Sequence, residues 1–139
     1  RYVMLEFPVD IDYETIAEAI RDISMDGYIP IVSHVETYSC LDEDEDMVEN
    51  LIKLGAYIQV DSGSVMGENG HDIRNFARKL VKNEMVHFIA TDAHDCDDKA
   101  PLMKECAEYI ERKCGFDYMN EVLYINPMAI IENDDVEII

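Results

Sequence analysis

The chain of 139 residues contains 48% hydrophobic and 30% charged residues, a balance typical of one globular domain with a hydrophobic core. Its 31 acidic residues against 11 basic ones give a net charge of −20, and such a surface repels the phosphates of nucleic acids and anionic lipids. No apolar run reaches the ~18 residues of a membrane span, and no signal peptide opens the chain. We therefore expect a cytoplasmic protein with no nucleic-acid partner and no membrane insertion.

Hydrophobic periodicity predicts strands that alternate with amphipathic helices. The predicted strands cover residues 2–6, 28–33, 56–60 and 86–91, and a short strand or extended piece covers 122–124. The predicted helices cover residues 12–25, 43–54, 72–82 and 101–114; a polar loop covers 61–64, and a last helical turn follows Asn126-Pro127. This alternation is typical of parallel β/α units. Since no linker or repeat interrupts it, we predict a single α/β domain.

Metal-binding types of side chain follow several of these strands. Glu6 ends the first strand, His34 follows the second, and Asp92 and His94 follow the fourth. Because the carboxyl ends of parallel strands meet at one edge of a sheet, we expect these side chains to converge. A lone Asp-x-His is common in loops, but the shared position of all four residues favours a metal site. Carboxylates and imidazoles without thiolates suit manganese, iron or zinc in a hydrolytic centre.

The remaining polar residues are open to plainer interpretations. Gln59, near the end of its predicted strand, is interpreted equally well as a substrate-binding residue and as a packed polar side chain. His87 lies inside a predicted strand, too far from its carboxyl end for the metal site, and we expect it in the core. His71 opens a predicted helix, where a surface or capping position is expected.

The cysteines do not form a recognisable site. Cys40, Cys96, Cys106 and Cys114 contain no Cys-x-x-Cys pair, so we expect free thiols. Cys106 and Arg112 match the Cys-x5-Arg spacing of thiolate phosphatases, but the interval has no glycine and is predicted to be helical. That chemistry needs a glycine-rich loop around the phosphate, so we interpret the match as accidental.

Several segments together resemble the C-terminal portion of the bacterial PHP-domain protein tyrosine phosphatases of capsule and exopolysaccharide operons, the CpsB/CapC group. The similar segments are Leu5-Glu6-Phe7-Pro8, Ile29-Pro30-Ile31-Val32-Ser33-His34-Val35-Glu36-Thr37-Tyr38, Gln59-Val60-Asp61-Ser62-Gly63-Ser64-Val65-Met66-Gly67, Val86-His87-Phe88-Ile89-Ala90-Thr91-Asp92-Ala93-His94 and Asn126-Pro127. The resemblance implies that residues 1–139 are the C-terminal portion of a single PHP phosphatase domain, a distorted (β/α)7 TIM-like barrel with parallel strands and outer helices.

The resemblance also implies a function. Members of this group hydrolyse phosphotyrosine in proteins, notably in a tyrosine autokinase that controls polysaccharide export, with up to three divalent metals usually described as manganese. Carried over to this chain, Glu6 and His34 would share one metal, and Asp92 and His94 would bind the other two as the catalytic residues. Lys99 and Gln59 would contact the substrate phosphate.

Two departures from the family pattern leave alternatives open. The family's opening His-x-His strand and other ligands would lie upstream of Arg1, so we expect this segment alone to be inactive and its open sheet edges to favour homo-oligomers. Thr37 and Lys99 stand where the family has arginines, which weakens the expected phosphate site. The alternatives are a degenerate, non-catalytic PHP domain with a binding or regulatory role, and a PHP phosphatase for a small metabolite phosphate.

Overall fold

The protein forms a parallel four-stranded sheet whose strand order, β1-β2-β3-β4, follows the chain. The computed structural model describes residues 1–91 and 96–132, with side chains for 1–91 and 102–132. The strands are β1 (Tyr2–Leu5), β2 (Ile29–Val32), β3 (Tyr57–Asp61) and β4 (Phe88–Ala90). Strands β1, β2 and β4 lie within strands expected from the sequence, and β3 extends one residue beyond its expected end.

Neighbouring strands pair close to their carboxyl ends. Leu5 pairs with Val32, Val32 pairs with Ile58, and Asp61 pairs with Ala90. The residues that follow each strand are therefore delivered to one edge of the sheet, the edge at which parallel α/β proteins place their functional groups.

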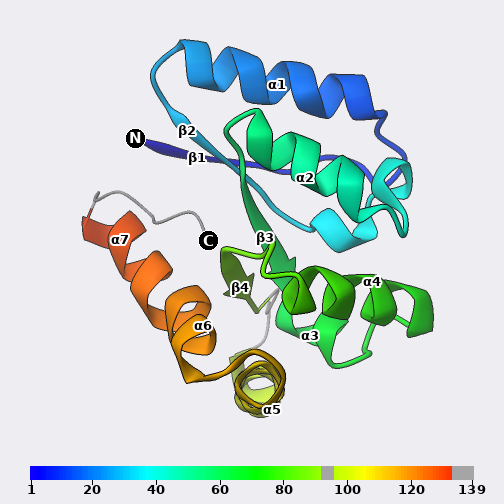
Figure 1. The fold of residues 1–139 in the computed structure, drawn as a ribbon, viewed down its shortest axis with the longest axis vertical. Helices are drawn as coiled ribbons and strands as arrows, with labels where there is room; N and C mark the ends of the chain where they lie inside the picture. Colours follow the sequence, from blue (N-terminus) through cyan, green and yellow to red (C-terminus); the bar gives the residue numbers. More distant parts are fainter. Residues whose placement is uncertain (92–95, 133–139) are drawn as a thin grey trace.

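Helices connect the strands and surround the sheet (Figure 1). The longer ones are α1 (Tyr13–Met25), α2 (Glu45–Lys53), α4 (His71–Lys82) and α5 (Cys96–Cys114). The short turns are η1 (Val35–Thr37), η2 (Ser39–Leu41), α3 (Ser62–Val65), α6 (Phe116–Asn120), η3 (Glu121–Ile125) and α7 (Asn126–Glu132). The carboxylate of Asp12 accepts a hydrogen bond from the backbone N–H of Thr15, which caps α1. None of the helices in the described part of the chain is long and apolar enough to cross a membrane.

The two faces of the sheet pack differently. Side chains alternate between faces along a strand, so Val32 and Ile58 face the main core with the apolar stripes of α1, α2, α4 and α5. Ile31, Tyr57 and Phe88 form a smaller cluster on the other face, against which α7 packs. The main core therefore lies between the sheet and its outer helices, as in a barrel wall.

Three local expectations were wrong. Residues 122–124 are not a strand but lie in η3, a π-helical turn that continues α6 into α7 and buries Val122. The expected loop at 61–64 is instead the last residue of β3 followed by α3. Helix α5 begins at Cys96, ahead of the expected start at Pro101. In each case a short segment follows its flanking elements, because a few residues cannot define a strand or a loop by themselves.

His87 is a core residue, as expected. It is 1% exposed and lies directly before β4, at the sheet edge opposite the strand carboxyl ends. Its Nδ1 accepts a hydrogen bond from the backbone N–H of Ile58 at 3.0 Å, and its carbonyl accepts one from Asn126 Nδ2 at 2.8 Å. Burial lowers the pKa of His87 to about 4, so the ring is neutral at physiological pH.

Candidate metal centre

His34 stands at the carboxyl end of β2 in an unusual backbone conformation. Its φ of 57° and ψ of 31° lie in the left-handed region, which non-glycine residues seldom adopt. The carbonyl of His34 accepts two hydrogen bonds from Thr37, one from the backbone N–H at 2.9 Å and one from Oγ1 at 2.7 Å. The η1 turn thus holds His34 in this conformation and aims its ring along the sheet edge.

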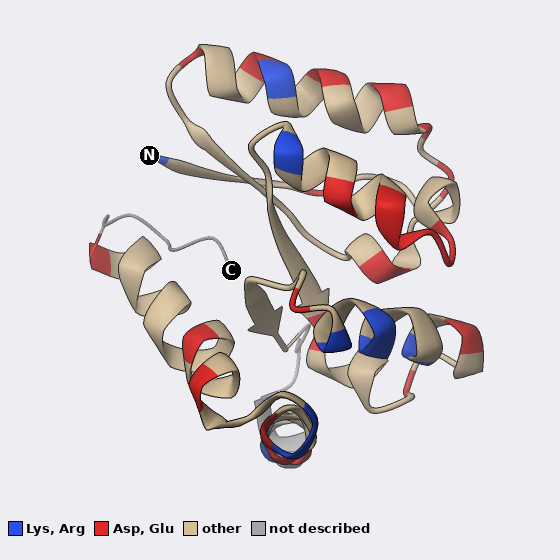
Figure 2. Ribbon diagram, viewed as in Figure 1, with Lys and Arg blue, Asp and Glu red and all other residues tan. Residues whose placement is uncertain are grey.

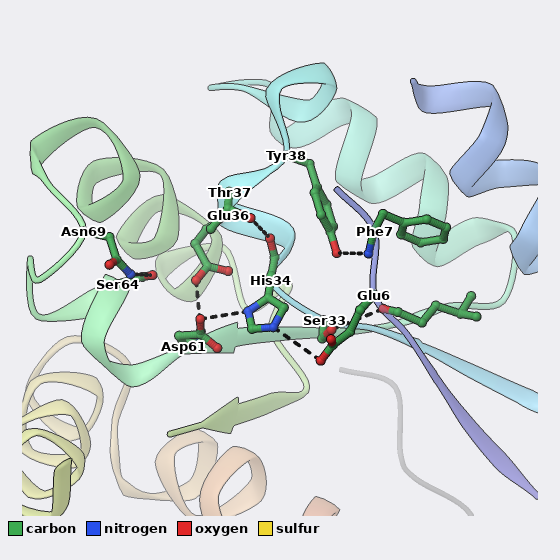
Figure 3. A network of polar contacts seen from close by, with 11 residues as sticks. Glu6, Phe7, Ser33, His34, Glu36, Thr37, Tyr38, Asp61, Ser64 and Asn69 are labelled. Carbon is green, nitrogen blue, oxygen red and sulfur yellow. Dashed lines mark hydrogen bonds and ion pairs between the residues drawn. The ribbon is translucent and has the colours of Figure 1, made fainter. Parts of the chain in front are cut away.

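The imidazole of His34 lies between two carboxylates (Figure 3). Its Nε2 is 3.4 Å from Glu6 Oε1, and its Nδ1 is 2.9 Å from Asp61 Oδ2. The two carboxylates differ in environment, since the Glu6 side chain is 63% exposed and that of Asp61 is 8% exposed. One member of this row lies at or just beyond the carboxyl end of each of the strands β1, β2 and β3.

Behind this row lies a buried acidic neighbour, Glu36 of η1. Its Oε2 accepts a hydrogen bond from the backbone N–H of Asp61 at 3.1 Å, and the residue is 4% exposed. Burial, and after it the nearby charge of Asp61, raise the pKa of Glu36 to about 7, although hydrogen bonds from Ser64 and from the Asp61 backbone lower it in part. Glu36 therefore anchors the end of β3 from inside the protein.

The structure brings together some of the expected site residues. Glu6 and His34 are adjacent, as the strand-end pattern predicted. Asp92 and His94 lie outside the described residues. Lys99 lies within α5, but its side chain is outside the described part of the structure. Gln59 lies in the middle of β3, paired with Phe88, rather than at the strand end.

The sequence interpretation missed Asp61. It ended the third strand at Val60 and assigned Asp61 to a loop, whereas β3 continues through Asp61. The signal was available, because Asp61 is a carboxylate at the end of a predicted parallel strand, in the same relation to its strand as Glu6 and Asp92. The same strand-end rule applied to the third strand would have found it.

A cavity of about 470 Å³ opens beside His34. Its lining residues are Phe7, Val9, His34, Thr37, Asp61, Asn69 and Ile73. His34 and Asp61 bring the row at the sheet edge to this cavity, Thr37 and Asn69 add further polar groups, and apolar side chains form the rest of the walls. Gln59 is not among the described residues that line it.

The donor set fits a divalent metal only in part. Two atoms that bind one ion at about 2.0–2.2 Å lie no more than about 4.4 Å apart, and Nε2 of His34 and Oε1 of Glu6 satisfy this limit at 3.4 Å. Imidazole and carboxylate donors suit manganese, iron or zinc. Within residues 1–91 and 102–132, no group of three or more His, Cys, Asp or Glu side chains is arranged to hold a metal. A complete centre therefore requires ligands from elsewhere.

The cysteine alternative does not fit the structure. Cys106 is fully buried in α5, and burial raises the pKa of its thiol to about 12. A nucleophilic cysteine needs an accessible thiolate of lowered pKa. The Cys106–Arg112 spacing is accidental, as expected from its helical pattern.

The parallel sheet with outer helices and a row of imidazole and carboxylate groups at its carboxyl edge is typical of barrel-type metal-dependent hydrolases. The family model described as "Capsular polysaccharide synthesis, CpsB/CapC" matches residues 1–132. The chain belongs to the CpsB/CapC family, and the resemblance noted in the sequence is confirmed.

Relatives with curated names agree with this assignment. The chain is 32% identical over 136 residues to the tyrosine-protein phosphatase CpsB of Streptococcus pneumoniae, covering 94% of this chain and 56% of that protein. It is 30% identical over 115 residues to the tyrosine-protein phosphatase YwqE of Bacillus subtilis, covering 83% and 45%. The putative tyrosine-protein phosphatase CapC of Staphylococcus aureus is 28% identical over 137 residues, covering 98% and 53%. The chain thus spans about half the length of these relatives.

A solved structure extends the likeness to three dimensions. The match has a TM-score of 0.87 at 26% identity and covers 98% of this chain and 55% of the other. It belongs to the crystal structures of YwqE from B. subtilis and CpsB from S. pneumoniae, described as unique metal-dependent tyrosine phosphatases. The predicted fold, a portion of the PHP-type α/β barrel, is confirmed.

Proposed function

We propose that this chain is the C-terminal portion of a metal-dependent protein tyrosine phosphatase domain. The observation that supports this most directly is the pairing of His34 Nε2 with Glu6 Oε1, 3.4 Å apart at the carboxyl edge of the sheet. Chance pairing is common on acidic surfaces, but here the pair lies where parallel barrels carry their active sites. Family membership and the names of the relatives point to the same activity.

In this proposal Glu6 and His34 hold one divalent ion, and Asp92 and His94 hold the others and serve as catalytic residues. When bound, the ions, with manganese as our first choice, would stabilise charge on phosphate oxygens as Lewis acids and would lower the pKa of a water molecule, so that it loses a proton and becomes a better nucleophile. The remaining ligands come from the part of the relatives that this chain does not span. The 139 residues alone are accordingly inactive.

The cavity beside His34 would receive the phosphotyrosine side chain. Phe7, Val9 and Ile73 supply apolar wall for an aromatic ring, and the polar row lies at one side. Lys99 remains our proposed cation for the phosphate. Gln59 is the weaker proposal of the two, because it lies inside β3 and does not line the cavity.

The substrate class follows from the family. We propose a phosphotyrosine protein, specifically a bacterial tyrosine autokinase of capsule or exopolysaccharide export, reached in the cytoplasm. The net charge of the chain is −20, and Figure 2 shows Asp and Glu spread over α1, α2 and the loops beside them. An autokinase tail with basic flanking residues would be attracted to such a surface.

One observation favours a second candidate, a degenerate domain that binds without catalysis. Thr37 stands where the family has arginine, and its hydroxyl donates to the carbonyl of His34. It therefore supports the backbone and offers no positive charge to a phosphate.

The test uses the intact gene product. Manganese-dependent hydrolysis of a phosphotyrosine peptide is measured for the wild type, His34→Ala, His94→Ala and the control His71→Ala, whose ring lies exposed at the start of α4. We expect losses on the order of 100-fold or more for the first two variants and none for the control. A wild type that binds manganese but does not hydrolyse the peptide would support the binding-only candidate. Hydrolysis that is unchanged in His94→Ala would contradict the roles of His94 as metal ligand and as catalytic residue.

A further inference from the structure

Asp61 contacts His34 through the ring nitrogen that does not face Glu6. We propose that Asp61 is a positioning residue, which holds the His34 ring and its proton in the arrangement that metal binding requires. This inference rests on the proposed metal role of His34 and extends it to a residue on a third strand.

The hydrogen bond determines which nitrogen carries the proton. A carboxylate only accepts, so at 2.9 Å from Asp61 Oδ2 the Nδ1 of His34 must be the donor. When a metal is bound, the single proton of the neutral ring then resides on Nδ1, and Nε2 presents its lone pair on the Glu6 side. A free histidine in water has no such constraint, so Asp61 removes the cost of selecting the correct tautomer and ring orientation. Carboxylates that bond to the second nitrogen of a metal-bound histidine also raise its basicity.

Asp61 is itself held firmly enough to do this. It is the last residue of β3 and pairs in register with Ala90 of β4. Its backbone N–H donates to the buried Glu36 at 3.1 Å, and its side chain is 8% exposed (Figure 3). A hydrogen bond to a charged group at a partly buried site is stronger than one in water.

The backbone of His34 is held in place as well. Thr37 fixes the left-handed conformation of His34 through two hydrogen bonds to its carbonyl. The side chain thus leaves a constrained backbone at one end and meets Asp61 at the other. His71 differs in both respects, because it lies exposed in the first turn of α4 and its Nδ1 contacts the guanidinium of Arg74 rather than a carboxylate.

The main competing role for Asp61 is that of a direct metal ligand. Its carboxylate faces the same cavity as His34, so both roles predict weaker binding when it is removed. They differ in the number of ions bound at saturation. Loss of a ligand empties a site, whereas loss of a positioning residue weakens a site that still fills.

The experiment measures manganese binding by the intact gene product, with competition against a fluorescent chelator for affinity and elemental analysis at saturation for the number of ions. The variants are Asp61→Asn, which keeps a neutral acceptor, and Asp61→Leu, which has none. Asp72→Asn on the first turn of α4 is the matched control, because it removes the same charge without removing the bond to His34. Thermal melting checks the folding of each variant; should Asp61→Leu not fold, Asp61→Asn decides.

We expect manganese affinity to fall by about 10- to 100-fold in Asp61→Leu and by less in Asp61→Asn, with an unchanged number of ions and an unaffected control. In the zinc-loaded protein, NMR of 15N-labelled histidine should show the His34 proton on Nδ1 in the wild type, and this signal should weaken or shift in Asp61→Leu. Unchanged affinity, or a smaller number of bound ions in either Asp61 variant, would overturn the inference.

His34→Ala separates this inference from the proposed function. If His34→Ala leaves both the affinity and the number of ions unchanged, His34 is not a ligand, and both the metal assignment and the inference are wrong. If His34→Ala empties a site while the Asp61 variants bind like the wild type, only the inference is wrong. Neither result depends on phosphatase activity.

Discussion

At the scale of single residues, the candidate site depends on a backbone conformation that the sequence does not announce. His34 adopts positive φ, which costs a non-glycine residue of the order of 1–3 kcal/mol unless neighbouring groups hold it. Thr37 supplies that support through its hydroxyl and its backbone N–H. Thr37 thus has a structural role beside the candidate metal ligand.

Thr37→Val should reveal this role, because valine keeps the shape of threonine and loses the hydroxyl that bonds to the His34 carbonyl. We expect a loss of about 1 kcal/mol in the free energy of unfolding and weaker manganese binding. Urea unfolding and chelator competition measure the two effects. Thr37→Ser, which keeps the hydroxyl, is the control, and equal behaviour of the two variants would show that the bond does not matter.

The buried ring of His87, at the opposite edge of the sheet, should make the stability of the protein depend on pH. Its pKa is about 4 in the folded protein and 6.5 in the unfolded chain, so unfolding takes up a proton between these values. The contribution of the neutral ring is complete above pH 6.5 and is lost as the pH falls toward 4, about 3 kcal/mol in total. Urea unfolding from pH 7.5 to 4 measures it.

His87→Asn is the comparison for this prediction, since Asn Oδ1 can accept from Ile58 N–H without titrating. The difference in stability between the wild type and the variant should shift in favour of the variant as the pH falls. Glu36 titrates with the opposite sign, because its pKa is raised to about 7 in the folded state. The difference between the two proteins removes that background, and a difference independent of pH would contradict the assignment.

At the scale of elements, glycine marks helix ends that the sequence predicted correctly. Helix α2 ends at Lys53, and Gly55 turns the chain into β3 with φ of 113°. Its backbone N–H donates to the carbonyl of Ile52 at 2.9 Å. A Cβ at this position would meet only Ser24 Oγ at 3.5 Å, an ordinary contact. Glycine is needed here for its backbone conformation, and not because neighbouring atoms would crowd a side chain.

Gly55→Ala should therefore destabilise the protein by about 1–2 kcal/mol through backbone strain alone. The measurement is the thermal midpoint and the urea midpoint of the variant. Lys53→Ala, an exposed change two residues away, is the control and should lie within about 0.5 kcal/mol of the wild type. A variant as stable as the wild type would show that the connection relaxes to another conformation.

At the scale of the whole molecule, the sheet has two edges that pair with no other strand among residues 1–91 and 96–132. Strand β1 pairs with β2 alone, and β4 pairs with β3 alone. Met4 on β1 is 49% exposed and Tyr28 directly before β2 is 49% exposed. Open edges with apolar neighbours favour pairing with another chain.

We expect the 139-residue chain expressed alone to self-associate at physiological ionic strength, where its charge of −20 is screened. Size-exclusion chromatography with light scattering measures the mass, and Met4→Lys should shift it toward the monomer because a charge on an edge strand opposes pairing. Ile131→Lys, on α7 at 77% exposure, is the control for a charge placed elsewhere. A monodisperse monomer for the unmodified chain would contradict the prediction.

The local pattern of the sequence determined most of the strands and helices and two of the candidate site residues. Alternating apolar periods identified the four strands and the helices α1, α2 and α4, because long periodic segments bury one face in any fold that they adopt. The same pattern placed Glu6 and His34 at strand ends, and parallel pairing then required them to meet. Short segments such as 122–124 were not determined locally, because their state depends on the elements to either side.

Only the tertiary structure decided how the candidate site is supported. The left-handed conformation of His34, the bond from its Nδ1 to Asp61, and the burial of Glu36 behind Asp61 join residues from η1 and two strands. No periodicity in the sequence encodes these contacts, since they depend on strand register and on a turn whose conformation is imposed by Thr37. The sequence therefore determined which residues reach the edge of the sheet, and the packing of three strands and one turn decided how they face one another.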